Sequence, residues 1–337
     1  MFTSGLQHVA AMYAGVVAPP MIVGPAVGLS AKETAFLMGA SLFTAGIATL
    51  LQTLGFWRIG ARLPFVNGVS FAGVTPMIAI GKDRGHDGIA VIFGAIIVAG
   101  LLGFVLAPYF CKLVRFFPPV VTGTVITLIG VSLLPVAFNW SQGGNATADD
   151  YGSTTNITMA AVTLVIVLAL RKLLRGFLQQ IAILLGLVVG TLIAVPAGIT
   201  DFGALGDADG LVPVAASVIA LVPLPVLGGA GIVLFGSVAA SGIQTLATAA
   251  LEKGENALIV AAAVGVGLIP IAAPGFYHAF PEDLLVVLDS GISTGCVVAI
   301  VLNLAFNHWG RTPDVPSDPE AVDSEQPKDP MAVPVAH

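Results

Sequence analysis

A twelve-residue motif occurs twice in this chain and constrains the fold more than any other feature. Pro119–Gly130 reads PVVTGTVITLIG and Pro225–Gly236 reads PVLGGAGIVLFG, so six of twelve positions are identical at an offset of 106 residues. Internal repeats in a very apolar chain are typical of secondary transporters, whose two homologous halves enclose a site near the middle of the membrane. The copies are unevenly placed: more than a hundred residues precede the first, but only about 26 separate the second from the preceding apolar run, which ends near Gly198. We therefore expect that the second half has lost most of its front part.

The composition predicts that lipid is the solvent of this chain. Charged residues make up only 9%, whereas a soluble globular protein carries about 25%. So few charges cannot cover a water-facing surface. The 13 basic residues form no cluster, which gives no sign of a nucleic-acid-binding surface. We interpret Cys111 and Cys296, which lie far apart in or beside apolar segments, as packing residues.

About ten apolar stretches are candidates for crossing a membrane. Nine of them meet the length of a span, roughly 17–25 mostly apolar residues. They are, approximately, 5–29, 33–54, 87–109, 118–138, 157–174, 177–197, 223–248, 256–274 and 283–306. The tenth, 64–81, is interrupted by two prolines and three glycines, so it is too short to cross as one regular helix. Such a broken segment is tolerated at membrane depth only where protein or a polar cavity satisfies its backbone, and it is the best single pointer to a substrate site.

The basic residues in the loops predict the orientation. With a cytoplasmic N-terminus, the inner loops hold eight basic residues and the outer loops three, as the positive-inside rule requires. The inner set is Arg58, Arg62, Lys112, Arg115, Arg171, Lys172, Arg175 and Lys253, and the outer set is Lys32, Lys82 and Arg84. In this topology the motif at 119 opens an outward span and the motif at 225 an inward span. The two copies are therefore predicted to be antiparallel, as in an inverted repeat.

Polar side chains inside the predicted spans give the candidate site. The broken segment holds Asn67, Ser70 and Phe71, which offer hydrogen bonds and a flat apolar face, among glycines that let a ligand approach the backbone. This combination suits a small planar polar heterocycle, and the alternative is a glycine-rich helix-packing interface. In the first span, Gln7 and His8 either shape a site or serve as interfacial or helix–helix contacts.

Acidic residues and enzyme signatures are scarce. Asp289 is the one carboxylate within a predicted span, and its position near Glu282 and Asp283 at the outer end is explained equally well by a solvated helix cap. The sequence therefore lacks an evident proton carrier. It also lacks a phosphate-binding loop, a metal-spaced His/Cys set and a His-Glu-x-x-His motif. We predict that the protein is not an enzyme and uses no metal or cofactor.

Five motifs, in this order, resemble those of the nucleobase–ascorbate transporter family, the xanthine/uracil permeases. They are Gln7–Gly15, Arg62–Pro64 with Gly68–Ala72, Phe117–Gly123, Arg175–Phe177, and Pro223–Gly229. The resemblance covers about residues 3–310. It implies fourteen spans in two inverted seven-span repeats, with a core domain from spans one to four and eight to eleven and a gate domain from the rest. It further implies that spans three and ten are half strand and half helix, and that their strands pair across the site.

The resemblance also implies the activity and the roles of residues. Family members transport purine or pyrimidine bases, typically coupled to protons, and often dimerise through gate spans. By motif match, Phe71 would stack on or abut the base, the backbone of Ser70 and Ala72 would line the pocket, Gly15 would approach the base, and His8 would support it. Gln7 and Asn67 complete the predicted substrate-binding set.

The chain departs from the family pattern in its second half. The acidic residue of span eight and the Gln/Glu-Asn-x-Gly region of span ten have no counterpart, and the gap falls between about Gly206 and Val214. We therefore predict an all-α polytopic membrane protein, a truncated 7+7 inverted-repeat fold with about ten crossings and one broken strand–helix segment. The predicted units are core-type spans 1–110 with the broken segment 64–81, gate-type spans 111–198, an outer linker 199–222, gate-type spans 223–311, and a disordered cytoplasmic tail 312–337.

The missing spans have a physical consequence. The strand half of the broken segment would lose its partner and leave backbone groups without hydrogen bonds at membrane depth, each costing several kcal/mol. We expect a plasma-membrane nucleobase symporter with cytoplasmic termini, for xanthine, urate or uracil, whose transport is impaired. The alternatives are an inactive remnant, a regulatory or assembly subunit that pairs with a full-length homologue, or, more distantly, an anion transporter of the same architecture.

Overall fold

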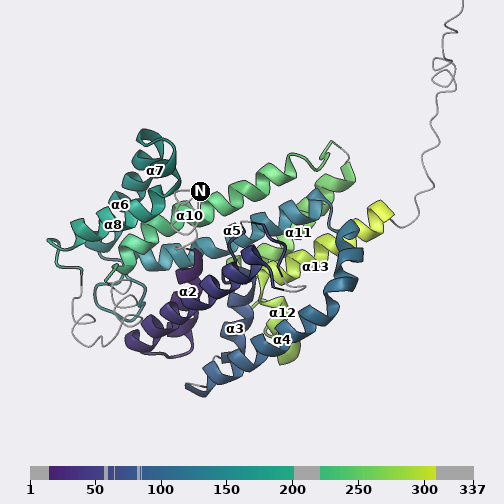
Figure 1. The fold of residues 1–337 in the computed structure, drawn as a ribbon, viewed down its shortest axis with the longest axis horizontal. Helices are drawn as coiled ribbons and strands as arrows, with labels where there is room; N and C mark the ends of the chain where they lie inside the picture. Colours follow the sequence, from purple (N-terminus) through teal and green to yellow (C-terminus); the bar gives the residue numbers. More distant parts are fainter. Residues whose placement is uncertain are drawn as a thin grey trace, which may run out of the picture.

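The computed structural model describes residues 15–56, 60–63, 65–81, 84, 86–200, 221–252 and 254–308, and within these ranges every regular element is helical (Figure 1). The first described helix is Gly15–Ala26. It is followed by α2 (Ala31–Leu54), α3 (Val74–Gly81), α4 (His86–Leu113), α5 (Pro119–Ser141), α6 (Thr154–Leu173), α7 (Phe177–Gln180), α8 (Ala182–Ala194), α10 (Leu224–Leu246), α11 (Gly254–Ala272), α12 (Glu282–Leu288) and α13 (Gly291–Asn303). Gln7, His8, most of the predicted linker and the whole predicted tail lie outside the described residues.

Six of these helices are long and apolar enough to cross a membrane: α2, α4, α5, α6, α10 and α11. Four shorter apolar helices lie at Gly15–Ala26, Phe71–Gly81, Ala182–Ala194 and Gly291–Asn307. Each of these ten helices falls within or largely overlaps one predicted stretch. The helical character of the chain and its six candidate spans agree with the prediction of an all-α polytopic membrane protein.

The two copies of the sequence motif open the helices α5 and α10, which pack against each other. Both helices begin after an extended proline, Pro118 or Pro223, and carry a second proline in the first turn, where its missing N–H costs nothing. A Cβ built on Gly123, near the start of α5, would lie 2.8 Å from the backbone nitrogen of Leu246, at the end of α10. At the other end of the pair, a Cβ on Gly228 would lie 2.7 Å from the Cα of Ser141. The helices are therefore antiparallel.

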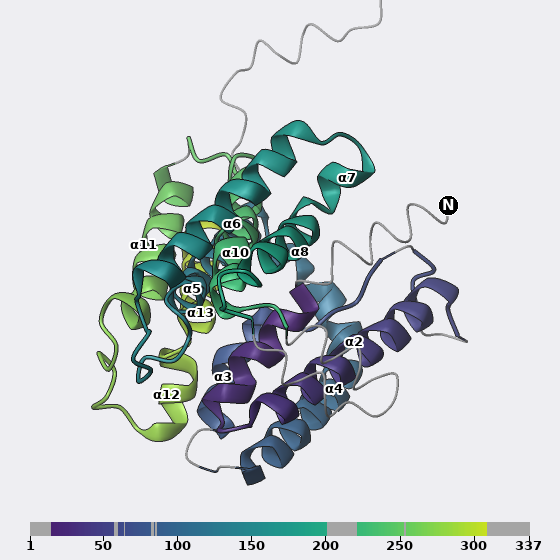
Figure 2. The same ribbon diagram turned by 90° about the vertical axis from the view of Figure 1, so that its left-hand side faces the viewer.

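The neighbours of this central pair are arranged symmetrically. Helix α6 packs on α8 and α10, and helix α11 packs on α13 and α5. Helix α8 also touches α10, as α13 touches α5. Figure 2 shows α11 on one side of the central pair and α8 on the other. These reciprocal contacts relate the triplets α5–α6–α8 and α10–α11–α13 by an approximate twofold axis, and we call the six helices together the six-helix bundle.

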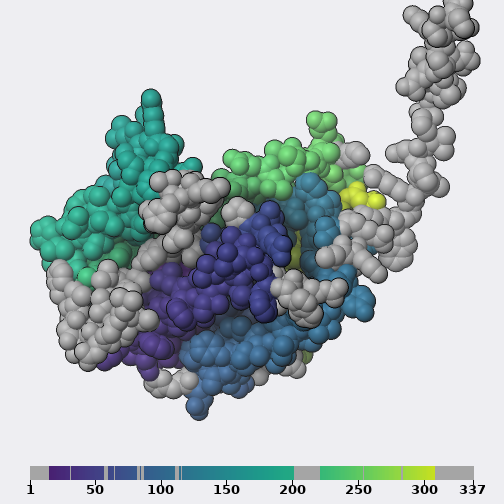
Figure 3. All heavy atoms as spheres, in the orientation of Figure 1, coloured from purple at the N-terminus to yellow at the C-terminus, as the bar shows by residue number. Residues whose placement is uncertain are grey.

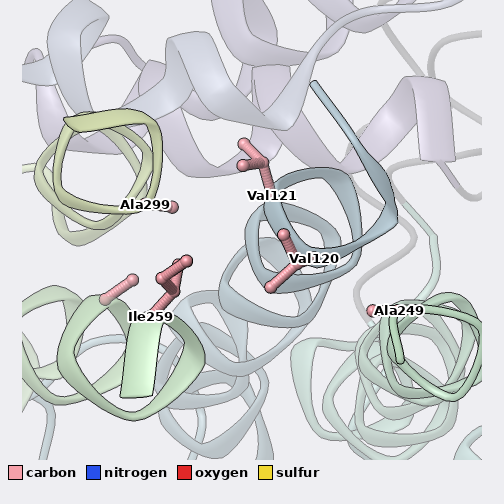
Figure 4. Packing of buried hydrophobic residues seen from close by; sticks show 6 residues of the cluster. Val120, Val121, Ala249, Ile259 and Ala299 are labelled. Carbon is pink, nitrogen blue, oxygen red and sulfur yellow. The ribbon is translucent and has the colours of Figure 1, made fainter. Parts of the chain in front are cut away.

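Small apolar side chains fill the six-helix bundle. Val120 and Val121 of α5 pack with Ile259 of α11 and Ala299 of α13, close to Ala249 just beyond α10 (Figure 4). Val121, Ile259 and Ala299 are fully buried. Because lipid tails are as apolar as these side chains, the stability of such an interface comes mainly from close packing.

The helix Gly15–Ala26 with α2, α3 and α4 forms a second unit, the N-terminal bundle, which occupies the lower front of the molecule in Figure 3. Val17 packs on Met38 of α2, while Val27 packs with Val74 of α3 and Ile92 of α4. Beyond these contacts α4 is exposed, and every residue from 96 to 110 is exposed.

The structure corrects three details. The predicted spans 177–197 and 283–306 are both interrupted, the first at Ile181 between α7 and α8 and the second at Asp289 and Ser290 between α12 and α13. The second break has a local cause, because the Ser290 hydroxyl caps α13 by accepting the N–H of Ser293 at 3.3 Å. The residues from Phe65 to Ser70 form no assigned strand, although the backbone at Ser70 is extended.

Candidate functional site

The extended part of the broken segment is held by helix α2. The backbone N–H of Asn67 donates to the Thr49 hydroxyl at 3.0 Å, and that hydroxyl donates to the Asn67 carbonyl at 3.4 Å. The Asn67 side-chain NH₂ donates to the carbonyl of Ala48 at 3.2 Å. A side chain of α2 thus supplies the backbone bonds that a neighbouring strand would otherwise provide. Asn67 therefore anchors the segment, and its NH₂ group is already engaged.

The first described helix lies against the same segment. A Cβ built on Gly68 would lie 2.9 Å from Cγ2 of Val16, so this glycine is needed for the close approach. A Cβ on the adjacent Gly15 would meet nothing within 4 Å. Val16, the neighbour of the predicted site residue Gly15, is therefore packed against the broken segment at Gly68.

The ring of Phe71 faces the six-helix bundle. It packs edge-on against Phe235 of α10, with ring centroids 5.6 Å apart and an interplanar angle of 85°. Phe235 is fully buried and also contacts Trp140 of α5 at 6.4 Å. The backbone around Phe71 turns from extended at Ser70 into a 3₁₀ turn and then into α3. The structure thus places the predicted stacking residue at the junction of the two bundles.

Sequence reasoning missed Phe235 and Trp140. A signal for Phe235 was present, because it is the only aromatic residue in either copy of the motif and stands where the first copy has Ile129. Nothing in the sequence indicated that this position faces Phe71, which lies more than 160 residues earlier.

A small apolar cavity lies beside this junction. It measures about 30 Å³ and is lined by the helix Gly15–Ala26, α5, α8 and α10, with Ala18, Met21, Trp140 and Leu227 among its walls. A cavity of this size holds about two water molecules. Ligand pockets are typically about 300–1,000 Å³, so this cavity is much too small for a nucleobase.

Acidic side chains lie at the ends of the helices. Glu33, Asp87 and Glu255 occupy first turns, where a negative charge favours the helix dipole. Asp289 is exposed at the break before α13, which agrees with its reading as a solvated cap.

Comparison with known proteins identifies the family. The profile of the Permease family, the xanthine/uracil permeases, matches residues 1–209 and again 208–276. The xanthine permease of Bacillus subtilis (strain 168) is 30% identical over 428 aligned positions, which cover 95% of this chain and 97% of that protein. The uric acid permease PucK of the same organism is 33% identical, with 90% and 94% covered. The uric acid transporter UacT of Escherichia coli (strain K12) is 31% identical, with 92% and 87% covered.

These matches extend over most of the chain and agree with the motifs and with the helical architecture. The chain belongs to the xanthine/uracil permease family, the nucleobase–ascorbate transporters, and is a multi-pass membrane transporter protein and not an enzyme.

Proposed function

We propose that this protein carries nucleobases across the cell membrane, with a purine such as xanthine or urate as substrate and uracil as the alternative. The observation that carries the proposal is the position of Phe71. An aromatic ring on a broken membrane segment, next to the Ser70 hydroxyl and opposite Phe235, offers a flat heterocycle a stacking face and polar groups at its edge. The names of the relatives support the same class of substrate.

In this proposal the base lies on Phe71 after the two bundles separate and Phe235 withdraws. The backbone of Ser70 and Ala72 lines the site, and the open side of Gly15 admits the ring. Gln7 and His8, which lie outside the described residues, belong to the proposed substrate-binding set by motif match. Proton coupling rests on the family resemblance, since the described carboxylates lie in loops or at helix ends.

We further propose that the chain is a permease that lacks spans eight to eleven. The alignment with the B. subtilis xanthine permease is 428 positions long, 91 more than the 337 residues of the chain, so at least 91 positions have no residue here. The two matches to the family profile meet at residues 208–209, inside the predicted gap of 206–214. The approximate twofold axis of the six-helix bundle supports an inverted repeat of which one core half is missing.

The remaining assignments follow from this fold. The ten apolar helices are the crossings, the bias of basic loop residues places both termini in the cytoplasm, and the plasma membrane is the location. The exposed outer surfaces of α6 and α11 are available for a homodimer.

Uptake in a permease-deficient cell tests the function. Cells expressing the chain receive radiolabelled xanthine, urate or uracil, with and without a protonophore. We expect slow, saturable, protonophore-sensitive uptake of a purine that Phe71→Ala abolishes. The matched control is Phe104→Ala, at a residue on α4 that is 73% exposed and remote from the contacts of Phe71. Uptake that is equal to that of empty cells for all three bases would refute the transport proposal.

A second candidate function is favoured by the gap itself. A chain with only one core bundle would act as a regulatory or assembly subunit of a full-length homologue, or would persist as an inactive remnant. Co-purification with a full-length permease from the same membrane supports the subunit, whereas rapid degradation of the isolated chain supports the remnant.

A further inference from the structure

The break between α12 and α13 places backbone groups without helical partners inside an apolar stretch. Helix α12 ends at Leu288 and α13 begins at Gly291, so the last carbonyls of α12 and the first N–H groups of α13 need partners outside their own helices. Two hydroxyl residues lie at the break: Ser290 is fully buried and Thr294 is 7% exposed. Because hydrocarbon offers no hydrogen-bond partner, an unsatisfied backbone group here would be costly.

The hydroxyl of Thr294 closes this break. Its Oγ1 lies 2.9 Å from the carbonyl oxygen of Val287, 3.1 Å from that of Leu288 and 3.0 Å from that of Ser290. Within the described residues the Leu288 carbonyl has no other recorded donor, whereas the carbonyls of Val287 and Ser290 also accept backbone N–H groups. A hydroxyl carries one hydrogen, so Thr294 can bond either a carbonyl of α12 or the carbonyl of Ser290 in front of its own helix.

The two sides of the break pack against different parts of the molecule. Helix α12 contacts α3 of the N-terminal bundle, beside which it lies in Figure 2, as well as its neighbour α13. Helix α13 packs on α11 and α5. A Cβ built on Gly291 would overlap the carbonyl oxygen of Gly267 on α11, and one on Gly295 would lie 3.0 Å from the carbonyl oxygen of Ala263. Backbone contacts this close fix the tilt of α13 on α11.

The other interrupted span lacks such a hydroxyl. Helix α8 has 13 residues, as α13 does, and follows the break at Ile181. Residues 177–190 contain neither serine nor threonine. The N–H of Ile181 donates to the carbonyl of Phe177 at 3.3 Å, within the same turn. The arrangement around Thr294 is therefore particular to α12 and α13 and does not follow from the sequence repeat.

We propose that Asp289 and Ser290 form a hinge at which α12 moves with the N-terminal bundle, and that Thr294 is the positioning residue that holds this hinge closed. The inference rests on the proposed transport function, in which the two bundles separate. In the closed state the Thr294 hydroxyl bonds the carbonyl of Leu288. When α12 moves away, the hydroxyl turns to the carbonyl of Ser290, so that opening costs one hydrogen bond, the one to Leu288.

Distances between pairs of spin labels test the hinge without a transport assay. The full chain, with Cys111→Ser and Cys296→Ser, is purified and placed in lipid nanodiscs. Both label pairs include Val287→Cys on α12; its partner is Val301→Cys on α13 in one pair and Ala79→Cys on α3 in the other, and all three residues are exposed.

The substitution Thr294→Val removes the hydroxyl and keeps the shape of the side chain. We expect it to raise the population of a second distance between positions 287 and 301 about fivefold, the change that one average hydrogen bond makes in an equilibrium. The distance between positions 287 and 79 should stay the same, because α12 moves together with α3. Unchanged distances between 287 and 301, or a changed distance between 287 and 79, would overturn the proposal.

Two variants separate positioning from general stability. Thr294→Ser keeps the hydroxyl and should restore the natural distances. Thr163→Val removes a hydroxyl that is fully buried and bonds only the carbonyl of Met159 within α6, at 2.9 Å, so it should change neither distance. If Thr294→Val does not fold, amide hydrogen exchange of the natural chain decides. The hinge predicts faster exchange at Asp289 and Ser290 than within α13, and equal protection would overturn it.

The hinge and the transport proposal fail separately. Distances that respond as expected, without uptake of any base, support the hinge and refute transport. Uptake by a chain whose distances do not respond to Thr294→Val refutes the hinge and leaves the transport proposal standing.

Discussion

The substitution Gly130→Ala tests whether direct backbone contact sets the packing of α5 on α10. A Cβ at position 130 would lie 2.7 Å from both the Cα and the Cβ of Ala239. Carbon atoms attract best at about 3.5–4.0 Å, so the helices must separate by about 0.8 Å at this point. A gap of that size forfeits roughly a quarter to a half of the contact energy of the neighbouring pairs. Overpacking of this kind costs about 1–3 kcal/mol, and we expect the upper half of the range because neither atom can rotate away.

The sequence repeat provides a matched control. Gly236 occupies the same position in the second motif copy, but a Cβ there would meet nothing within 4 Å. Gly236→Ala should therefore be neutral, or stabilising by up to about 1 kcal/mol through helix propensity. Thermal unfolding of the detergent-purified protein, followed by circular dichroism, reports the difference. At about 2–4 °C per kcal/mol, Gly130→Ala should lower the midpoint by roughly 4–12 °C. Equal midpoints for the two variants would refute the packing argument.

Three further substitutions test local features. Thr49→Val removes the hydroxyl that bonds both the N–H and the carbonyl of Asn67. It should lower stability by about 1–3 kcal/mol and speed amide hydrogen exchange across the broken segment. The control Thr44→Val loses only hydrogen bonds within α2 and should leave exchange in the broken segment unchanged. Asn156→Leu removes the NH₂ group that donates to the carbonyls of Gln142 and Asp150, which each keep one backbone N–H donor. We expect about 0.5–1.5 kcal/mol of destabilisation with faster proteolysis of the loop before α6, and unchanged proteolysis would contradict this role. Ala250→Gly should raise stability by about 1 kcal/mol, because Ala250 has a left-handed φ of 49°, which glycine adopts without strain. A lower midpoint of thermal unfolding for this variant would contradict the strain at Ala250.

The sequence predicted the elements better than their contacts. The motif copies mark the first turns of α5 and α10 because proline and glycine leave a pattern that can be read locally. The broken segment was predicted for the same reason, since its prolines and glycines interrupt an apolar run. The interruptions at Ile181 and at Asp289 and Ser290 were missed, because a break of one or two residues hardly changes the average hydropathy of a span.

The candidate site required tertiary information. Phe71, Ser70 and Gly15 were predicted as site residues from residue type and motif, and the structure packs Val16, next to Gly15, against Gly68 of the same segment as Phe71. The contact between Phe71 and Phe235 joins residues far apart in sequence, and no periodicity encodes it. Asn67, predicted as a substrate-binding residue, also holds the segment in place, because its NH₂ group donates to the carbonyl of Ala48 on α2, 19 residues away. A polar side chain near a site can hold the backbone in place or bind the substrate, and the sequence alone does not distinguish these two roles.

The central claim is that the chain holds one wall of a nucleobase site and lacks the other. The most direct test compares xanthine and urate uptake by the natural chain with uptake by a chain in which the absent segment of a relative has been inserted at residues 206–214. We predict that the repaired chain accumulates a purine at least tenfold faster and loses this activity on Phe71→Ala. If the natural chain transports as fast as the repaired one, the site is already complete and the account is wrong.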